Sequence, residues 1–126
     1  MKNVFYLLIF STIVFASCKK DDNCDDTNLS TTIVGEWSVS ALGFVVGDVE
    51  FKSDGTLIDV DDVLVGGEIG GQPLDEKSYT VNGNSSITVR AENNSGSLEF
   101  DFDVSEYSCE EISMDVSGIP ASLDRK

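Results

Sequence analysis

The chain has 126 residues, enough for one domain but not for two. Its 23 acidic residues outnumber 8 basic ones, and the net charge of −15 excludes nucleic acid as a partner, because phosphate binding requires clustered lysine and arginine. Histidine is absent, which removes the commonest general base and the commonest transition-metal ligand. With no nucleophile motif either, we expect a protein that is not an enzyme, has no catalytic residues and binds no metal or cofactor.

Residues 1–17 have the layout of a secretory signal peptide that is removed from the mature protein. A positive charge at Lys2 precedes a nearly unbroken apolar run from 4 to 15, and two small residues stand before Cys18. The run is too short for a membrane-spanning helix, which needs roughly 20 apolar residues. An amphipathic first helix of a globular domain would show polar residues at helical spacing, a pattern that this run lacks.

Residues 18–32 are polar and charged, and Leu29 is the single large apolar residue among them. Such a segment has no periodic apolar face to bury. The sequence therefore predicts a flexible, disordered acidic tether over 18–32, followed by a folded domain over 33–126.

From residue 33 onward, apolar and polar residues alternate with period two, and no segment shows a convincing helical stripe. The cleanest example is 98–104, where Leu98, Phe100, Phe102 and Val104 alternate with polar residues. Short antiparallel strands with one apolar face predict a β-barrel or a sandwich, and closure into a barrel removes exposed strand edges. The predicted strands are 35–41, 48–52, 56–60, 79–82, 87–91, 98–104 and 112–116, with turns at 52–55, 82–84 and 93–96.

The segment 63–74 fits this pattern least well. It contains four glycines, which weaken a strand and suit a mobile loop or a sharply bent strand.

Asp59, Asp61 and Asp62 form the densest acidic cluster of the predicted domain. A calcium loop would need a bending glycine and a closing glutamate, which this cluster lacks. Because Ile58 and Val60 continue one face of the strand, the pattern favours a solvated opposite face that carries Asp59 and Asp61.

Ala16, Ser17 and Cys18 resemble the lipobox of bacterial lipoproteins, although Phe15 stands where that family usually has an aliphatic residue. The resemblance implies that Cys18 becomes the first residue of the mature chain and carries diacylglycerol and palmitate, so that the lipid makes the membrane a partner. The segment 20–22 resembles the export signal of Bacteroidetes lipoproteins. It implies an outer-membrane location with exposure at the cell surface.

The region 33–123 resembles the lipocalin-like domains found in such lipoproteins. The resemblance rests on Gly35 and Trp37 in the first strand, on a Phe-x-x-Asp-Gly-Thr hairpin that begins at Phe51, and on Tyr79 before Asn/Gly turns. It implies a small antiparallel up-and-down β-barrel whose Trp37 plugs the closed end under an arginine. Arg90 and Arg125 are the two candidates, and Arg125 is nearer the expected place.

Once Cys18 is assigned to lipid, Cys24 and Cys109 remain as an even pair. Export would place them in an oxidising compartment, where they can form a disulfide that staples the tether to the segment before the last predicted strand. Two unpaired thiols are the alternative.

The first hypothesis for function is a binding module that holds a small or apolar ligand in the barrel mouth. The candidate lining residues are Trp37, Phe44, Phe51, Tyr79, Phe100 and Phe102, although the alternation of Trp37 with Val39 also suits a core position. The alternative is a non-enzymatic interaction or inhibitor domain that binds a protein or a glycan at the cell surface. Its signature would be a filled barrel with exposed Phe44, Val45 and Val46, or a rigid projecting loop at 66–72.

Overall fold

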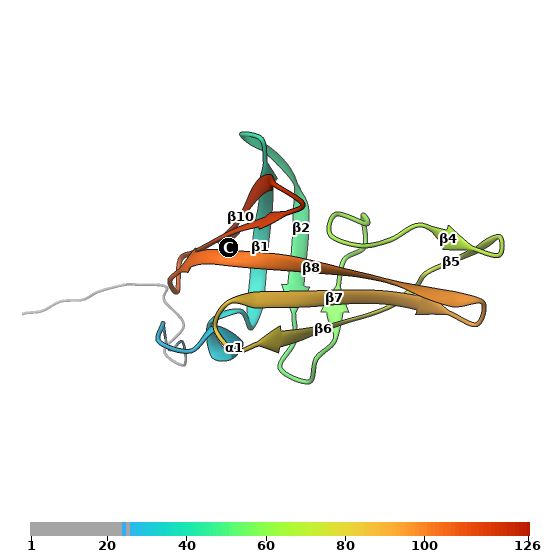
Figure 1. Ribbon diagram of the computed structural model, residues 1–126, viewed down its shortest axis with the longest axis horizontal. Helices are drawn as coiled ribbons and strands as arrows, with labels where there is room; N and C mark the ends of the chain where they lie inside the picture. Colours follow the sequence, from blue (N-terminus) through green and yellow to red (C-terminus); the bar gives the residue numbers. More distant parts are fainter. Residues whose placement is uncertain (1–23, 25) are drawn as a thin grey trace, which may run out of the picture.

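The computed structural model describes Cys24 and residues 26–126, which form a nearly closed antiparallel β-barrel (Figure 1). A single short helix, α1 (Leu29–Thr32), precedes the strands of the described part. The strands are β1 (Gly35–Ala41), β2 (Phe44–Phe51), β3 (Leu57–Ile58), β4 (Glu68–Ile69), β5 (Gln72–Pro73), β6 (Glu76–Asn82), β7 (Ser86–Asn93), β8 (Gly96–Tyr107), β9 (Glu111–Val116) and β10 (Ile119–Arg125).

The eight strands of the main sheet follow the order β3-β2-β1-β10-β9-β8-β7-β6. Apart from the β1–β10 pair, strands that are neighbours in this sheet are also successive along the chain, and the β1–β10 pair joins the two ends of the domain. The predicted up-and-down barrel is therefore confirmed. The barrel closes incompletely between β3 and β6, which meet at a bridge between Thr56 and Ser78.

The core follows from the alternation along each strand, because successive side chains of a strand point to opposite faces of the sheet. On β1 the inward residues Trp37 and Val39 are buried, and on β7 Ile87, Val89 and Ala91 are buried. These side chains join the buried residues of β2, β9 and β10 in one hydrophobic core. The polar residues between them lie on the outside.

Two strands differ from the predicted pattern. In β3 the phase is opposite, since Leu57 and Asp59 are buried and Ile58 and Val60 are exposed. β3 has only two residues, Leu57–Ile58, and follows a turn directly, so few positions are available from which its phase could be predicted. β10 was missed, because Pro120 and the small residues of 117–122 weaken its strand signal.

The segment 63–74, expected to be a mobile loop or a bent strand, forms the two-stranded β4–β5 hairpin and its flanking loops. Val65 and Leu74 from this segment are buried in the core. The segment thus covers the incomplete side of the barrel between β3 and β6.

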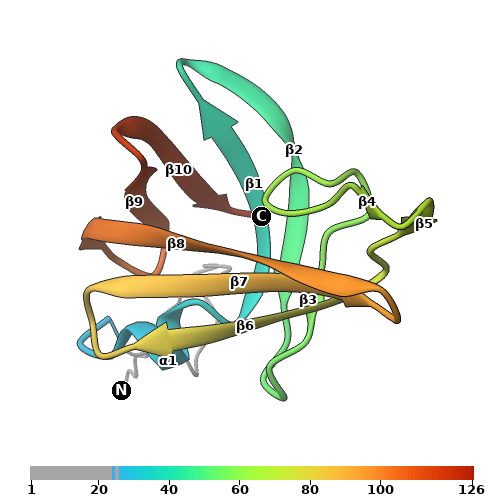
Figure 2. The same cartoon turned by 45° about the vertical axis from the view of Figure 1, so that its right-hand side comes forward.

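The tether prediction is wrong for residues 29–32, which belong to the folded domain. They form α1, capped by Asn28, whose side chain accepts a hydrogen bond from the Ser30 N–H. Leu29, Thr32 and Ile33 are completely buried, so a single Leu29 was enough to anchor a segment without apolar periodicity. Figure 2 shows α1 across the end of the barrel where β1 begins. Residues 18–23 and 25 of the expected tether lie outside the described residues.

Candidate functional site

A disulfide joins Cys24 to Cys109, with 6.0 Å between the Cα atoms. Of the two alternatives that the sequence left open, a disulfide and two unpaired thiols, the first is therefore present. Cys109 lies in the connection between β8 and β9, so the bridge fastens the segment before α1 to the barrel. The expected lipid attachment residue, Cys18, and the expected signal peptide of residues 1–17 lie outside the described residues.

Trp37 and Arg125 form the centre of the closed end of the barrel. The Arg125 guanidinium stacks over the Trp37 ring at 4.1 Å from its centroid, while Trp37 Nε1–H donates to the Ile33 carbonyl at 2.7 Å. The same guanidinium donates to the carbonyls of Thr32, Val34 and Cys109, with distances of 2.7, 2.8 and 2.9 Å. One side chain of β10 therefore holds the N-terminal segment, the first strand and the disulfide region together.

Arg90, the other candidate, lies on the outer face of β7. It pairs with Glu92 at 3.2 Å and with Glu99 at 3.0 Å. These two hydrogen-bonded carboxylates raise the pKa of Arg90, so its charge is fixed on the outer surface rather than over the tryptophan.

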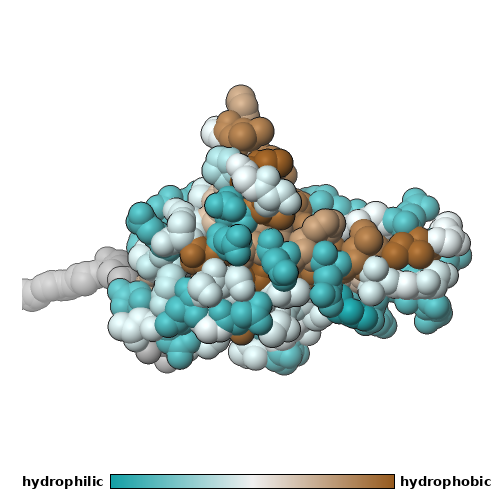
Figure 3. Space-filling model, in the orientation of Figure 1, coloured by the Kyte–Doolittle hydropathy of each residue, from teal (hydrophilic) through white to brown (hydrophobic). Residues whose placement is uncertain are grey.

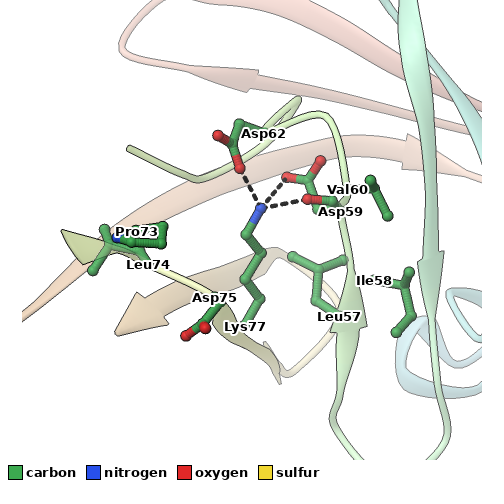
Figure 4. A pocket seen from close by; sticks show the side chains of 9 residues that line it. All are labelled: Leu57, Ile58, Asp59, Val60, Asp62, Pro73, Leu74, Asp75 and Lys77. Carbon is green, nitrogen blue, oxygen red and sulfur yellow. Dashed lines mark hydrogen bonds and ion pairs between the residues drawn. The ribbon is translucent and has the colours of Figure 1, made fainter. Parts of the chain in front are cut away.

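An open pocket of about 400 Å³ lies between β3 and the β5–β6 connection (Figure 4). Leu57, Leu74 and Lys77 are among the residues that line it. The Lys77 ammonium donates to the Asp59 backbone carbonyl and, at 2.6 Å, to the Asp62 carboxylate, and it lies 4.0 Å from the Asp59 carboxylate. The buried Lys77 ammonium is thus balanced by two carboxylates, of which Asp62 is the nearer.

Asp59 was predicted to face solvent, and this prediction is wrong. Its carboxylate is buried and accepts hydrogen bonds from the backbone N–H groups of Val63, Leu64 and Val65 at 2.6 to 3.0 Å. A buried carboxylate is tolerated when such donors and a cation compensate it. Asp59 therefore holds the loop that covers the barrel. The sequence does not reveal this role, because nothing distinguishes Asp59 from Asp61 and Asp62 in the same acidic run.

The six aromatic candidates for ligand binding do not surround one cavity. Trp37, Phe51 and Phe102 are core residues with at most 5% exposure. Tyr79 packs edge-to-face on Phe51 with ring centroids 4.9 Å apart, and its hydroxyl donates to the Lys52 carbonyl at 2.5 Å. Phe44 and Phe100 are exposed. The residues proposed to line a ligand site therefore fill the barrel or lie on its surface.

The environment of Tyr79 changes its acidity. Partial burial raises the pKa of the Tyr79 hydroxyl above its usual value of 10.0, and the negative charge of Asp54 adds to this effect. The pKa of Asp54 itself is lowered, because the side chain and the backbone N–H of Thr56 hydrogen-bond to its carboxylate.

Exposed apolar side chains gather at the opposite end of β1. We call them the apolar tip: Leu42, Phe44, Val45 and Val46 of the β1–β2 hairpin and Ile119 of the β9–β10 hairpin, each between 49 and 73% exposed. The two hairpins are neighbours because β1 pairs with β10, with Ala41 opposite Ala121. In Figure 3 the β1–β2 tip projects as a hydrophobic knob above a largely hydrophilic surface.

The local backbone explains why three apolar residues follow one another in this hairpin. A β-bulge shifts the register between Val39 and Ser40, so that Val39 pairs with Gly47, Ser40 with Val45, and Val46 is the extra residue. The bulge breaks the two-faced alternation at Val46, and Phe44, Val45 and Val46 are all exposed.

The turn at the apolar tip carries a second unusual feature. Leu42 and Gly43 both have positive φ, 54° and 87°, as in the two-residue hairpin turns that favour Asn-Gly. A leucine in this left-handed conformation is uncommon and is less stable there than asparagine or glycine. The chain thus keeps an exposed apolar side chain at a position where a polar residue would suit the backbone better.

Comparisons with known proteins supply no relative: no protein-family model, no curated protein and no solved structure matches the chain. Within Cys24 and residues 26–126, no helix has the length and apolar character required to cross a bilayer. The same part of the chain contains no group of three or more cysteine or acidic residues placed to hold a metal ion.

Proposed function

We propose that the chain is an exported lipoprotein, anchored to the outer membrane through Cys18, whose lipocalin-like barrel is a non-enzymatic interaction domain at the cell surface. The observation that carries this proposal is the apolar tip, which exposes five large apolar side chains on a protein of net charge −15. Clustered exposed apolar residues of this kind mark sites of interaction, whereas isolated ones are common on any surface.

The lipocalin-like assignment is supported by the closed end of the barrel. The stacking of Arg125 over Trp37 is the arrangement that the resemblance implies, and the arginine comes from the last strand. In this domain, however, the buried positions of Trp37, Phe51 and Phe102 favour a filled barrel over a hollow one. We therefore assign the proposed function to the surface of the barrel rather than to its interior.

The position of the tip relative to the anchor supports an outward-facing site. Cys24 is bonded to the barrel at the end where β1 begins, and it follows Cys18 by six residues, a distance of at most about 20 Å in an extended chain. The apolar tip lies at the other end of β1, beyond Ala41. A lipid at Cys18 would thus hold the closed end near the membrane and direct the tip away from it.

The chemistry of the tip favours a protein as partner. Residues 39–47 and 116–123 contain no charged side chain, and four of the five tip residues are aliphatic. Such a surface gains free energy by entering an apolar pocket, at roughly 25 cal/mol per Å² buried. A glycan offers a mainly polar surface, and it would leave these side chains without a suitable counterpart.

The proposal is tested with substitutions in the tip that should change partner binding without unfolding the domain. Leu42→Asn removes the apolar side chain but suits the positive φ, so we expect it to retain or increase the free energy of unfolding while partner binding falls. Phe44→Ser should weaken binding further. The control is Val60→Ser, because Val60 is 83% exposed but lies outside the tip.

The measurement is photo-crosslinking on intact host cells from a photoreactive residue at position 45, with position 60 as the matched reference. We expect one protein to be crosslinked from position 45, with loss of the product in Leu42→Asn and retention in Val60→Ser. Equal crosslinking from both positions, or a product insensitive to both tip variants, would contradict the proposal. A small molecule that travels with the domain in native mass spectrometry and leaves with Phe51 or Phe102 variants alone would instead support an interior ligand site.

A further inference from the structure

β8 is unevenly paired with its two neighbours. It pairs with β7 from Gly96 to Asp103, but with β9 only from Asp103 onward. β9 ends at Val116, and the chain turns back into β10 through Ser117 and Gly118, both with positive φ. Figure 2 shows the arm of β8 that extends beyond β9. Residues 97–102 of β8 therefore form an open edge, for which the described residues supply no backbone partner on the β9 side.

The direction of the free backbone groups follows from one hydrogen bond. The Val104 N–H donates to the Ser85 carbonyl at 2.8 Å, on the β7 side of the strand. In a strand, the backbone groups of successive residues point alternately to the two sides. The N–H and carbonyl groups of Ser97, Glu99 and Asp101 therefore point to the open side, where a further strand could pair with them.

The two faces beside this open edge differ in character. On the inner face, Phe100 is 42% exposed, although it shares that face with the buried Phe102. On the outer face, Glu99, Asp101 and Asp103 follow one another at alternate positions. The open edge thus combines an exposed phenylalanine on one face with an acidic row on the other.

The acidic row is incompletely neutralised. Arg90 pairs with Glu99, and the Thr88 hydroxyl donates to Asp101 at 2.6 Å. Asp103 lies directly opposite Asp115 of β9, and the ion pairs of the described residues include neither carboxylate. Like charges directly opposite each other in a sheet are destabilising, which a cation brought in by a partner would relieve.

We propose that the open edge of β8 binds an extended segment of a partner protein by β-strand addition, and that this segment alternates apolar residues with lysine or arginine. Its backbone pairs with Ser97, Glu99 and Asp101, its apolar side chains cover Phe100, and its cations lie beside Asp101 and Asp103. A second copy of the chain is a poor occupant, because its own acidic residues would meet this row. The inference rests on the proposed role as an interaction domain, but it uses a different surface from the apolar tip.

The test uses the disulfide-bonded domain and a synthetic heptapeptide of alternating lysine and valine with blocked ends. We expect saturable changes of the backbone amide resonances of Ser97, Glu99 and Asp101, and weaker binding at high salt. A second peptide has the same side chains but is N-methylated on the edge that faces β8. Its affinity should be at least about tenfold lower, because it loses the backbone hydrogen bonds. Equal binding of both peptides would overturn the inference, as would changes spread over the whole acidic surface.

Variants of the protein provide an independent test of the same inference. Asp101→Asn and Asp101→Pro remove the same charge, but only the proline removes the N–H that faces the open side, where an edge strand tolerates proline. We expect Asp101→Asn to retain most of the binding and Asp101→Pro to lose it. If Asp101→Pro does not fold, the N-methylated peptide decides. Leu42→Asn should leave peptide binding unchanged. The peptide experiment therefore tests the open edge alone, and a negative result there is distinguishable from a negative result of the crosslinking at the tip.

Discussion

At the scale of single residues, the Arg125 side chain links the last strand to the N-terminal segment, to Trp37 of β1 and to the disulfide region. It stacks on Trp37 and donates to three backbone carbonyls, two from the N-terminal segment (Thr32 and Val34) and one from the β8–β9 connection (Cys109). Lysine cannot reproduce this, because a point charge with a flexible stem lacks the planar fork of the guanidinium. The sequence resemblance pointed to this residue, but the three carbonyl partners could not be predicted, because they depend on how the N-terminal segment folds back.

We therefore expect Arg125→Met to lower the free energy of unfolding by about 2–4 kcal/mol, since it leaves buried carbonyl groups without donors. Arg125→Lys should recover little of this loss. Arg90→Met is the matched control, and its loss of stability should be much smaller than that of Arg125→Met because the ion pairs of Arg90 are exposed and screened by solvent. Urea unfolding of the three variants provides the measurement, and equal losses at positions 90 and 125 would contradict the role assigned to Arg125.

Tyr79 should make the stability of the folded protein depend on pH. Because its pKa is raised in the folded state, the folded protein retains the phenol proton at a pH where the unfolded chain releases it. The resulting contribution to stability is complete below pH 10.0, the usual pKa, and is lost as the pH rises through the raised pKa. We expect the stability of the wild type to fall more steeply above pH 10 than that of Tyr79→Phe. Parallel pH profiles of the two proteins in chemical denaturation would show that Tyr79 does not contribute.

At the scale of elements, Cys24 and residues 26–34 act as a strap across the closed end. The disulfide fixes one end, the Leu29 N–H donates to the Asn84 side chain at 2.9 Å, and Leu29 and Ile33 are buried. The disulfide links residues 85 positions apart, so its removal frees a long loop in the unfolded chain. The disulfide is therefore expected to stabilise the barrel end as well as the strap itself.

The double variant Cys24→Ser/Cys109→Ser should lose about 2–5 kcal/mol of stability in the loop-entropy account. Because Arg125 and the buried Leu29 still hold the strap, we expect the barrel to fold, with faster amide hydrogen exchange in 28–34 than in the wild type. The amides of β7 serve as the internal reference for global unfolding. Unchanged exchange in 28–34 would show that the disulfide does not restrain the strap.

Elements were predictable from the sequence to different degrees, and the reason is physical. β1 and β7 have one buried face each, so their alternation is visible in the residues. β8 alternates as clearly in sequence, but Phe102 is its one buried residue, because much of the strand extends beyond β9. α1 is too short for a periodic stripe, and its burial depends on a disulfide and a distant asparagine. The apolar tip was visible as a run of apolar residues, but its exposure depends on a bulge whose register involves the partner strand. The open edge of β8 was invisible, because it depends on where β9 ends.

At the scale of the whole molecule, pairing of the first and last strands closes one side of the barrel. β10 pairs with β1, and the Lys126 N–H donates to the Glu36 carbonyl at 3.1 Å while its ammonium pairs with Asp48 at 2.8 Å. The alternation within each strand predicts a barrel, but it does not say which strands are neighbours. Here the neighbours follow from the up-and-down topology, and the point of incomplete closure falls in mid-chain, where the 63–74 segment covers it. The acidic outside and the uncharged tip thus occupy defined and separate regions of one molecule.

The last prediction concerns the attachment of this molecule to a membrane. A single acyl chain gives marginal and reversible binding, whereas a diacylglyceryl group supplies two chains and stable anchoring. If the lipobox is used, the mature protein begins at Cys18, carries the lipid, and stays with the membrane after a high-salt wash but not after detergent extraction. Cys18→Ser should be released into the soluble fraction, while Cys24→Ser/Cys109→Ser should remain anchored, because its lipobox is intact. Intact mass spectrometry of the mature protein decides the question, since an unmodified Cys18 or retained residues 1–17 would refute the anchor and, with it, the outward orientation of the tip.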